Sequence, residues 1–112
     1  MKQNEADQIE SMYIHYHYKC FCHGNPAKQR AHIIGQTVPN YKVYGKAIVD
    51  DPLNWLPACD TDCNSLIDTG KNTLLKNSIE RYIKSGNRAE IEQLVRDNIA
   101  RKKERLCKPY DV

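Results

Sequence analysis

The sequence predicts an α+β fold in which two short strands lie between N- and C-terminal helices. Apolar residues recur at helical spacing near both ends of the chain. Short apolar runs at residues 31–34 and 54–57, next to glycine or proline, are instead typical of strands. A chain of 112 residues fits a single domain. A core of this size often needs a further cross-link to be stable.

The first part of the chain is expected to contain a helix, a turn and a strand. Apolar and aromatic residues recur at helical spacing within residues 4–16. Residues 13–18 also alternate as a strand would, so we expect the helix to give way to a strand there. Residues 20–26 have the composition of a tight turn, and Gly35 is expected to end the strand over residues 31–34.

The middle of the chain is predicted to be a long loop followed by a strand and a helix. Residues 36–52 contain proline, glycine and paired aspartates, which indicates a loop. The second strand follows at residues 54–57. Asp60 or Thr61 can then cap a helix that runs to about Gly70.

Two further helices are predicted at the C-terminal end. Asn72 or Thr73 can cap the first, and a Ser-Gly pair ends it at Gly86. Asn87 can cap the last helix, with Glu90 at the capping-box position. We expect one domain over residues 1–112, with a core at about 19–70 and a helical extension at about 72–107.

Composition and charge restrict the class of protein. No apolar run approaches the roughly 20 residues of a membrane helix, and the polar N-terminus does not resemble a secretory signal, so we expect a cytoplasmic protein without a membrane partner. The net charge is +3. Residues 1–70 hold 6 Lys and Arg against 8 Asp and Glu, whereas residues 71–112 hold 11 against 6. The basic half would meet a polyanion, although a solvated helical surface explains it equally well.

Four of the five cysteines form two close pairs that flank the central segment. Cys20 and Cys22 lie in the predicted turn, and Cys59 and Cys63 follow the second strand. Two such pairs predict a structural Zn²⁺ site with four thiolate ligands. His23 stands three residues after Cys20 and is an alternative ligand, while disulfides or buried thiols are the other interpretations.

A set of polar residues is interlocked with the cysteine pairs. His32 lies in the first apolar strand, Asn54 opens the second strand, which leads to Cys59, and Asn64 directly follows Cys63. In this order and context the sequence resembles the HNH endonuclease family over about residues 19–70. The resemblance implies a small zinc-stapled ββα-metal core with additional N- and C-terminal helices. It also suggests a small member of the family, of the type that phages or mobile elements carry.

The resemblance implies roles in phosphodiester hydrolysis for these residues. His32 would be the general base that activates water, and Asn54 would fix the loop and orient the imidazole. Asn64 would be a ligand of one catalytic Mg²⁺ or Mn²⁺, and Asp68, one helical turn later, could supply a carboxylate. Many family members carry another metal ligand where this chain has Ala31.

That departure at residue 31 leaves the second ligand open. Asp50 or Asp51 could supply it instead, and weakened or lost activity is a further alternative. A non-catalytic, zinc-stabilised module that binds nucleic acid is therefore the competing function, and a protein-interaction domain built on the C-terminal helices is a third.

DNA is the expected partner, and basic side chains would contact its phosphates. The candidates are Lys28, Arg30, Lys42, Lys46, Lys71 and Lys76. The apolar stripe of the last helix could pack on the core or on a second copy, so a homodimer through the C-terminal helices is an alternative to a monomer.

Overall fold

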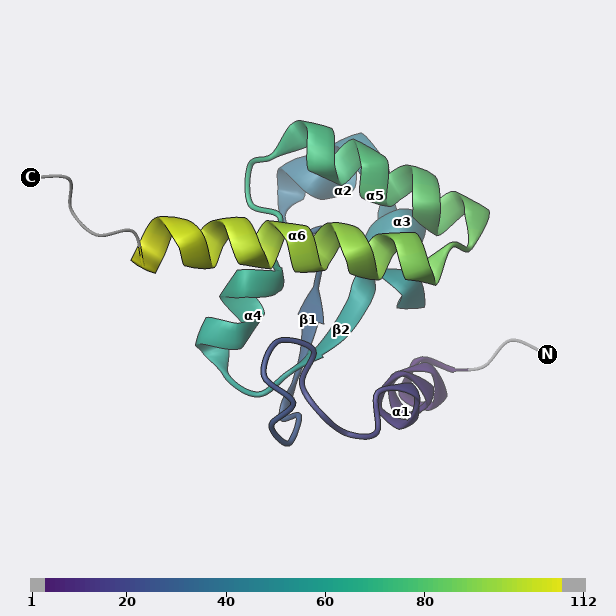
Figure 1. Cartoon of the computed structure of the whole chain (residues 1–112). Coiled ribbons are helices and arrows are strands. Elements are labelled where there is room, and N and C mark those ends of the chain that lie inside the picture. The colour runs from purple at the N-terminus through teal and green to yellow at the C-terminus, as the bar shows by residue number, and fades with distance from the viewer. Residues whose placement is uncertain (1–3, 108–112) are drawn as a thin grey trace, which may run out of the picture.

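The computed structural model describes the chain over residues 4–107, with side chains to residue 104. Within this range six helices, a short 3-10 turn and a two-stranded sheet confirm the predicted α+β class (Figure 1). The elements are α1 (Glu5–His15), β1 (Gln29–His32), α2 (Val38–Tyr44), α3 (Lys46–Val49), η1 (Pro52–Asn54), β2 (Trp55–Ala58), α4 (Thr61–Ile67), α5 (Thr73–Ser85) and α6 (Arg88–Cys107).

The two strands form an antiparallel hairpin-like pair although more than twenty residues of chain separate them. The register pairs Gln29 with Ala58 at one end and His32 with Trp55 at the other. Helix α4 packs against both strands, and α6 runs across α4 and lies beside α5 (Figure 1). Helix α1 contacts β2 and η1. The strands and α4 therefore bring the predicted site segments together.

Local sequence signals explain where several helices begin and end. Asn4, Asp60 and Asn72 accept backbone N–H bonds at the starts of α1, α4 and α5, as expected of N-cap residues. Asn87 does the same at the start of α6, where its side chain accepts from the Glu90 N–H at 3.2 Å. Gly86 ends α5 with a φ of 70°, a conformation that glycine adopts without strain.

The prediction of a loop over residues 36–52 is wrong in part, because α2 and α3 lie within it. Thr37 caps α2 through a 3.3 Å bond from the Asn40 N–H, and Pro39 lies in its first turn. The Tyr44 hydroxyl donates to Asn77 at 2.7 Å and ties the end of α2 to α5. Helices this short depend on such tertiary contacts.

The strand expected over residues 13–18 is also absent from the described structure. Helix α1 extends to His15, and His17 and Tyr18 both have a φ of 56°, which ends the helix in a left-handed bend. The extended chain begins only at an isolated bridge between Lys19 and Pro26. Residues 13–15 therefore follow the helical spacing of the preceding residues and not the strand-like alternation of residues 13–18.

One hydrophobic cluster spans the strands and the C-terminal helices. Ile33, Leu56 and Ile67 are buried beside Ile91 and Val95 of α6. The apolar stripe of α6 is therefore used by this chain's own core at these positions. Among the described residues, no helix combines the length and apolar character needed to cross a bilayer.

Candidate functional site

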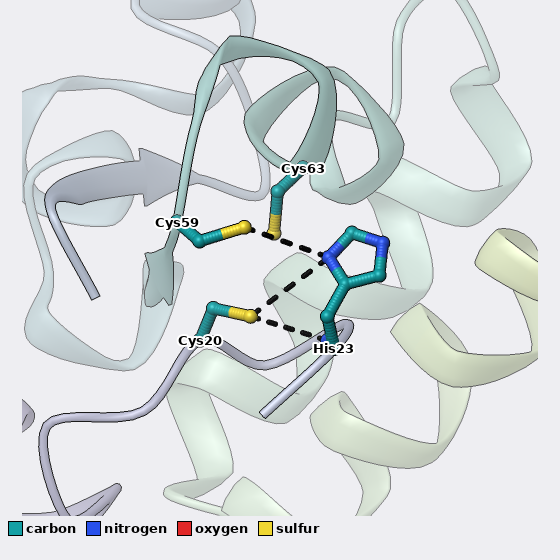
Figure 2. Close-up of side chains that lie close together, drawn as sticks. All are labelled: Cys20, His23, Cys59 and Cys63. Atoms are coloured by element: carbon teal, nitrogen blue, oxygen red, sulfur yellow. Dashed lines mark hydrogen bonds between the residues drawn. The ribbon is translucent and has the colours of Figure 1, made fainter. Parts of the chain in front are cut away.

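Two turns bring four metal-ligating side chains together beside β2. The ligand atoms of Cys20, His23, Cys59 and Cys63 all lie within 4.8 Å of one another. Figure 2 shows the three sulfur atoms and the His23 ring nitrogen directed toward a common centre. Three thiols and an imidazole in this arrangement could hold a metal ion such as zinc.

Backbone contacts position both turns. The Cys20 N–H donates to the Asn25 carbonyl at 2.6 Å, and Gly24 has a φ of 72°, which closes the turn that carries His23. The Phe21 N–H donates to the Pro57 carbonyl at 2.9 Å and joins this turn to β2. Cys59 directly follows β2, and Cys63 lies in the first turn of α4, where it is fully buried.

Hydrogen bonds within the group favour thiolate at Cys20. The backbone N–H of His23 donates to Cys20 Sγ at 3.2 Å, and the ring Nδ1 of His23 lies 3.6 Å from Cys59 Sγ. Burial raises the pKa of Cys20, but bonds from the His23 and Asn25 backbones and from the Cys59 and His23 side chains outweigh it and lower the pKa to about 7. Burial and the bond to Cys20 raise the pKa of Cys59 to about 11. A metal ion would need both thiols deprotonated.

The structure brings His23 into this group in place of Cys22. The Cys22 thiol instead donates to the Cys63 carbonyl at 3.6 Å. The turn directs the Cys22 side chain toward the Cys63 backbone and the His23 ring toward the Cys20 and Cys59 thiols. The ligand set Cys20, Cys22, Cys59 and Cys63 is therefore corrected to the alternative with His23. The Cys107 side chain lies outside the described residues.

A separate polar pocket lies where the end of β1 meets α4. It contains four of the predicted site residues, Arg30, His32, Asn64 and Asp68. Its volume is about 270 Å³, and its lining residues are Arg30, His32, Gly35, Gln36, Asn64, Ser65 and Asp68. A pocket of this kind can accept a charged group of a ligand.

His32 is held in this pocket as a neutral imidazole near pH 7. Its ring meets Trp55 edge-on, with 6.3 Å between ring centroids. Burial is the main cause that lowers its pKa below the ordinary 6.5, and the positive charge of Arg30 lowers it further against the opposing charge of Asp50. An imidazole that is neutral at this pH can accept a proton.

Asn54 is fully buried and fixes the loop that follows His32. Its Oδ1 accepts from the Ile34 N–H at 2.8 Å. Its Nδ2 donates to the carbonyl oxygens of Ile34 at 2.9 Å and Val49 at 2.8 Å. The Ile33 N–H also donates to the Asn54 carbonyl at 2.8 Å. Asn54 therefore acts on the backbone beside His32 and not on the pocket itself.

The far wall of the pocket is formed by α4 and its C-terminal cap. The Asn64 amide donates to Gln29 Oε1 at 3.1 Å. A Cβ atom at position 35 would lie 3.2 Å from Asp68 Oδ1, so glycine at this position leaves room for the carboxylate. Lys102 of α6 donates to the carbonyls of Ser65 at 2.8 Å and Asp68 at 2.5 Å, which caps the end of α4.

Neither Ala31 nor the two aspartates that could replace a ligand there line this pocket. Ala31 is fully buried on the core side of β1. Asp51 caps η1 by accepting from the Leu53 N–H at 2.9 Å. Asp50 accepts from Lys46 at 2.6 Å and from the Tyr41 hydroxyl at 2.9 Å. Within the described chain, the oxygen-bearing side chains of the pocket are Gln36, Asn64, Ser65 and Asp68.

The six predicted phosphate-binding cations occupy different surroundings. Arg30 lies in the pocket, 4.5 Å above the Trp55 ring, and pairs with Glu5 of α1 at 3.0 Å. Lys46 pairs with Asp50, and Lys76 donates to Asn40 Oδ1 at 3.0 Å. The side chains of the remaining three, Lys28, Lys42 and Lys71, are exposed.

Gln29, Gln36 and Lys102 are site residues that sequence reasoning missed. No sequence pattern marks them, since each acts through a partner at least five positions away. Comparisons of the chain with protein-family models, with curated proteins and with solved structures found no match.

Proposed function

We propose that this protein is a metal-dependent endonuclease of the HNH type that hydrolyses phosphodiester bonds in DNA. The observation that carries the proposal is the polar pocket, in which His32, Asn64 and Asp68 line one surface beside Arg30. His32 comes from β1, Asn64 from α4 and Asp68 from the C-cap of α4, and the resemblance implies the same order along the chain.

His32 is the proposed general base. Its lowered pKa leaves one ring nitrogen unprotonated at neutral pH, and this nitrogen can take a proton from water. Asn54 holds the Ile34 backbone through two side-chain bonds and the Val49 carbonyl through a third, which fixes the chain directly after His32. Arg30 would contact the phosphate, which requires that it exchange its bond to Glu5 for one to the substrate.

The oxygen atoms of Asn64 and Asp68 would hold a catalytic Mg²⁺ or Mn²⁺, since both are hard ligands on one side of the pocket. When bound, such an ion stabilises charge on the phosphate and on the leaving oxygen. Cys20, His23, Cys59 and Cys63 would hold a structural Zn²⁺ that ties the N-terminal turn to β2 and α4.

DNA outside the pocket would be contacted by the exposed cations Lys28, Lys42 and Lys71. Lys46 and Lys76 would contribute only after leaving Asp50 and Asn40. A homodimer through the C-terminal helices would place two such sites for cleavage of both strands. A monomeric mass by light scattering at the concentration used for cleavage would exclude that arrangement.

The test is cleavage of supercoiled plasmid by the purified protein with Mg²⁺, with Mn²⁺ or with EDTA. We expect metal-dependent nicking that is lost in His32→Ala and retained in His15→Ala, an exposed histidine outside the pocket. Activity that persists in His32→Ala would contradict the assignment of the base. Failure to cut plasmid, single-stranded and branched DNA with either metal would contradict the nuclease.

A non-catalytic zinc module that binds nucleic acid is the second candidate. The burial of Ala31 and the engagement of Asp50 and Asp51 elsewhere favour it, because they leave few carboxylates for a catalytic metal. It predicts salt-dependent DNA binding that His32→Ala leaves unchanged, with no cleavage.

A further inference from the structure

We propose that Gln29 is a positioning residue that turns the oxygen of the Asn64 amide toward the pocket. The inference rests on the proposed function, because it concerns how a metal ligand of that site is oriented. It is carried by the bond in which Asn64 Nδ2 donates to Gln29 Oε1 at 3.1 Å.

The chemistry of an amide makes its orientation matter. Only the oxygen of Asn64 can bind a hard cation, since the NH₂ group is a donor without a usable lone pair. The bond to Gln29 occupies the NH₂ end. Across the described residues, Asn64 Oδ1 receives no hydrogen bond, so its lone pairs are available on the wall of the pocket.

Gln29 is well placed to impose this orientation because its backbone is fixed. It pairs with Ala58 in the sheet, and β1 packs against α4. Asn64 is fixed on α4, which Asp60 caps through a 2.8 Å bond from the Cys63 N–H. If the Asn64 amide alone turned over, two amide oxygens would face each other at the 3.1 Å now occupied by a hydrogen bond. That repulsion disfavours the reversed amide.

Gln29 could itself turn over and donate to Asn64 Oδ1, and this alternative makes the proposal testable. A carboxylate at position 29 can only accept, so Gln29→Glu allows just the orientation in which Asn64 donates. Gln29→Met keeps the length and neutrality of the side chain but accepts no ordinary hydrogen bond. Thr61→Glu is the charge control, because it places a carboxylate on exposed surface one helical turn before Asn64.

The first readout is the Mn²⁺ concentration that half-activates plasmid nicking. We expect Gln29→Met to raise it about fivefold, the equivalent of one ordinary hydrogen bond, without a matching fall in the rate at saturating Mn²⁺. Gln29→Glu should restore or improve on the wild-type value, whereas Thr61→Glu should leave it near that value. In an Asn64→Asp background, where either oxygen can face the metal, Gln29→Met should have little effect.

The second readout does not require cleavage. Mn²⁺ should broaden the side-chain amide signals of Asn64 and Gln29 in nitrogen-edited NMR spectra, and Gln29→Met should need more Mn²⁺ for the same broadening of Asn64. If broadening behaves in this way but no DNA is cut, the nuclease proposal fails and the orientation role stands. The role is overturned if Mn²⁺ leaves the Asn64 signals sharp, if Gln29→Met matches the wild type, or if Gln29→Glu is no better than Gln29→Met.

Discussion

Replacement of His23 and of Cys22 should separate the two sets of metal ligands. His23 Nδ1 lies 3.6 Å from Cys59 Sγ, within the group of four, whereas Cys22 Sγ bonds a backbone carbonyl. We therefore expect His23→Ala to weaken metal binding strongly and Cys22→Ser to bind one equivalent of metal as the wild type does.

The magnitude follows from how such sites contribute to folding. A structural zinc site contributes about 10–16 kcal/mol of apparent binding free energy, so an even share for each of four ligands is about 2.5–4 kcal/mol. His23→Ala should thus weaken Zn²⁺ binding by about two to three orders of magnitude. Cys22→Ser loses only a long thiol–carbonyl bond and should change the free energy of unfolding by less than about 1 kcal/mol.

The assay combines metal competition with the absorption spectrum of the Co²⁺-substituted protein. Three sulfurs and one nitrogen should produce a tetrahedral spectrum that Cys22→Ser leaves unchanged, and His23→Cys should shift it toward a four-sulfur spectrum. The reasoning is refuted if Cys22→Ser changes the spectrum while His23→Ala does not. It is also refuted if the cysteines form disulfides in protein purified with a reductant.

Three further predictions concern the pocket and its supports. Asn54→Ala removes three buried hydrogen bonds and should lower the free energy of unfolding, measured in urea, by about 3–5 kcal/mol. The cap variant Asn87→Ala should lower it by about 1 kcal/mol, and equal losses in the two variants would contradict the role of Asn54. Because the folded-state pKa of His32 lies below 6.5, its contribution to stability is complete above that pH and declines as the pH falls through the folded pKa. His32→Gln should therefore flatten the fall in urea stability between neutral pH and about pH 5, and an unchanged slope would count against a lowered pKa. Glu5→Gln should free Arg30 and tighten binding of a DNA duplex by about two- to fivefold at low salt without added Mg²⁺ or Mn²⁺, as measured by fluorescence anisotropy. Glu10→Gln should not tighten binding, and no difference between the two variants would show that the 3.0 Å pair does not compete with phosphate.

The sequence by itself determined the features that depend on neighbouring residues. The caps at Asp60, Asn72 and Gly86 were predictable because each cap bond joins residues no more than four positions apart. The α+β class and the position of α4 follow from the same short-range patterns. The two cysteine-bearing turns could also be located in this way, because their spacing is a property of the sequence.

The tertiary structure decided which residues meet. The strand expected over residues 31–34 lies at Gln29–His32, and the Asn54 side chain, twenty positions from Ile34, bonds the N–H and the carbonyl of Ile34 in place of a strand partner. The choice of His23 over Cys22 depends on the direction in which a tight turn aims each side chain. The bond from Asn64 to Gln29 crosses from α4 to β1 and carries no signal in the spacing of either segment. Contacts between distant segments depend on the packing of whole elements, and packing is not encoded in any local window of sequence.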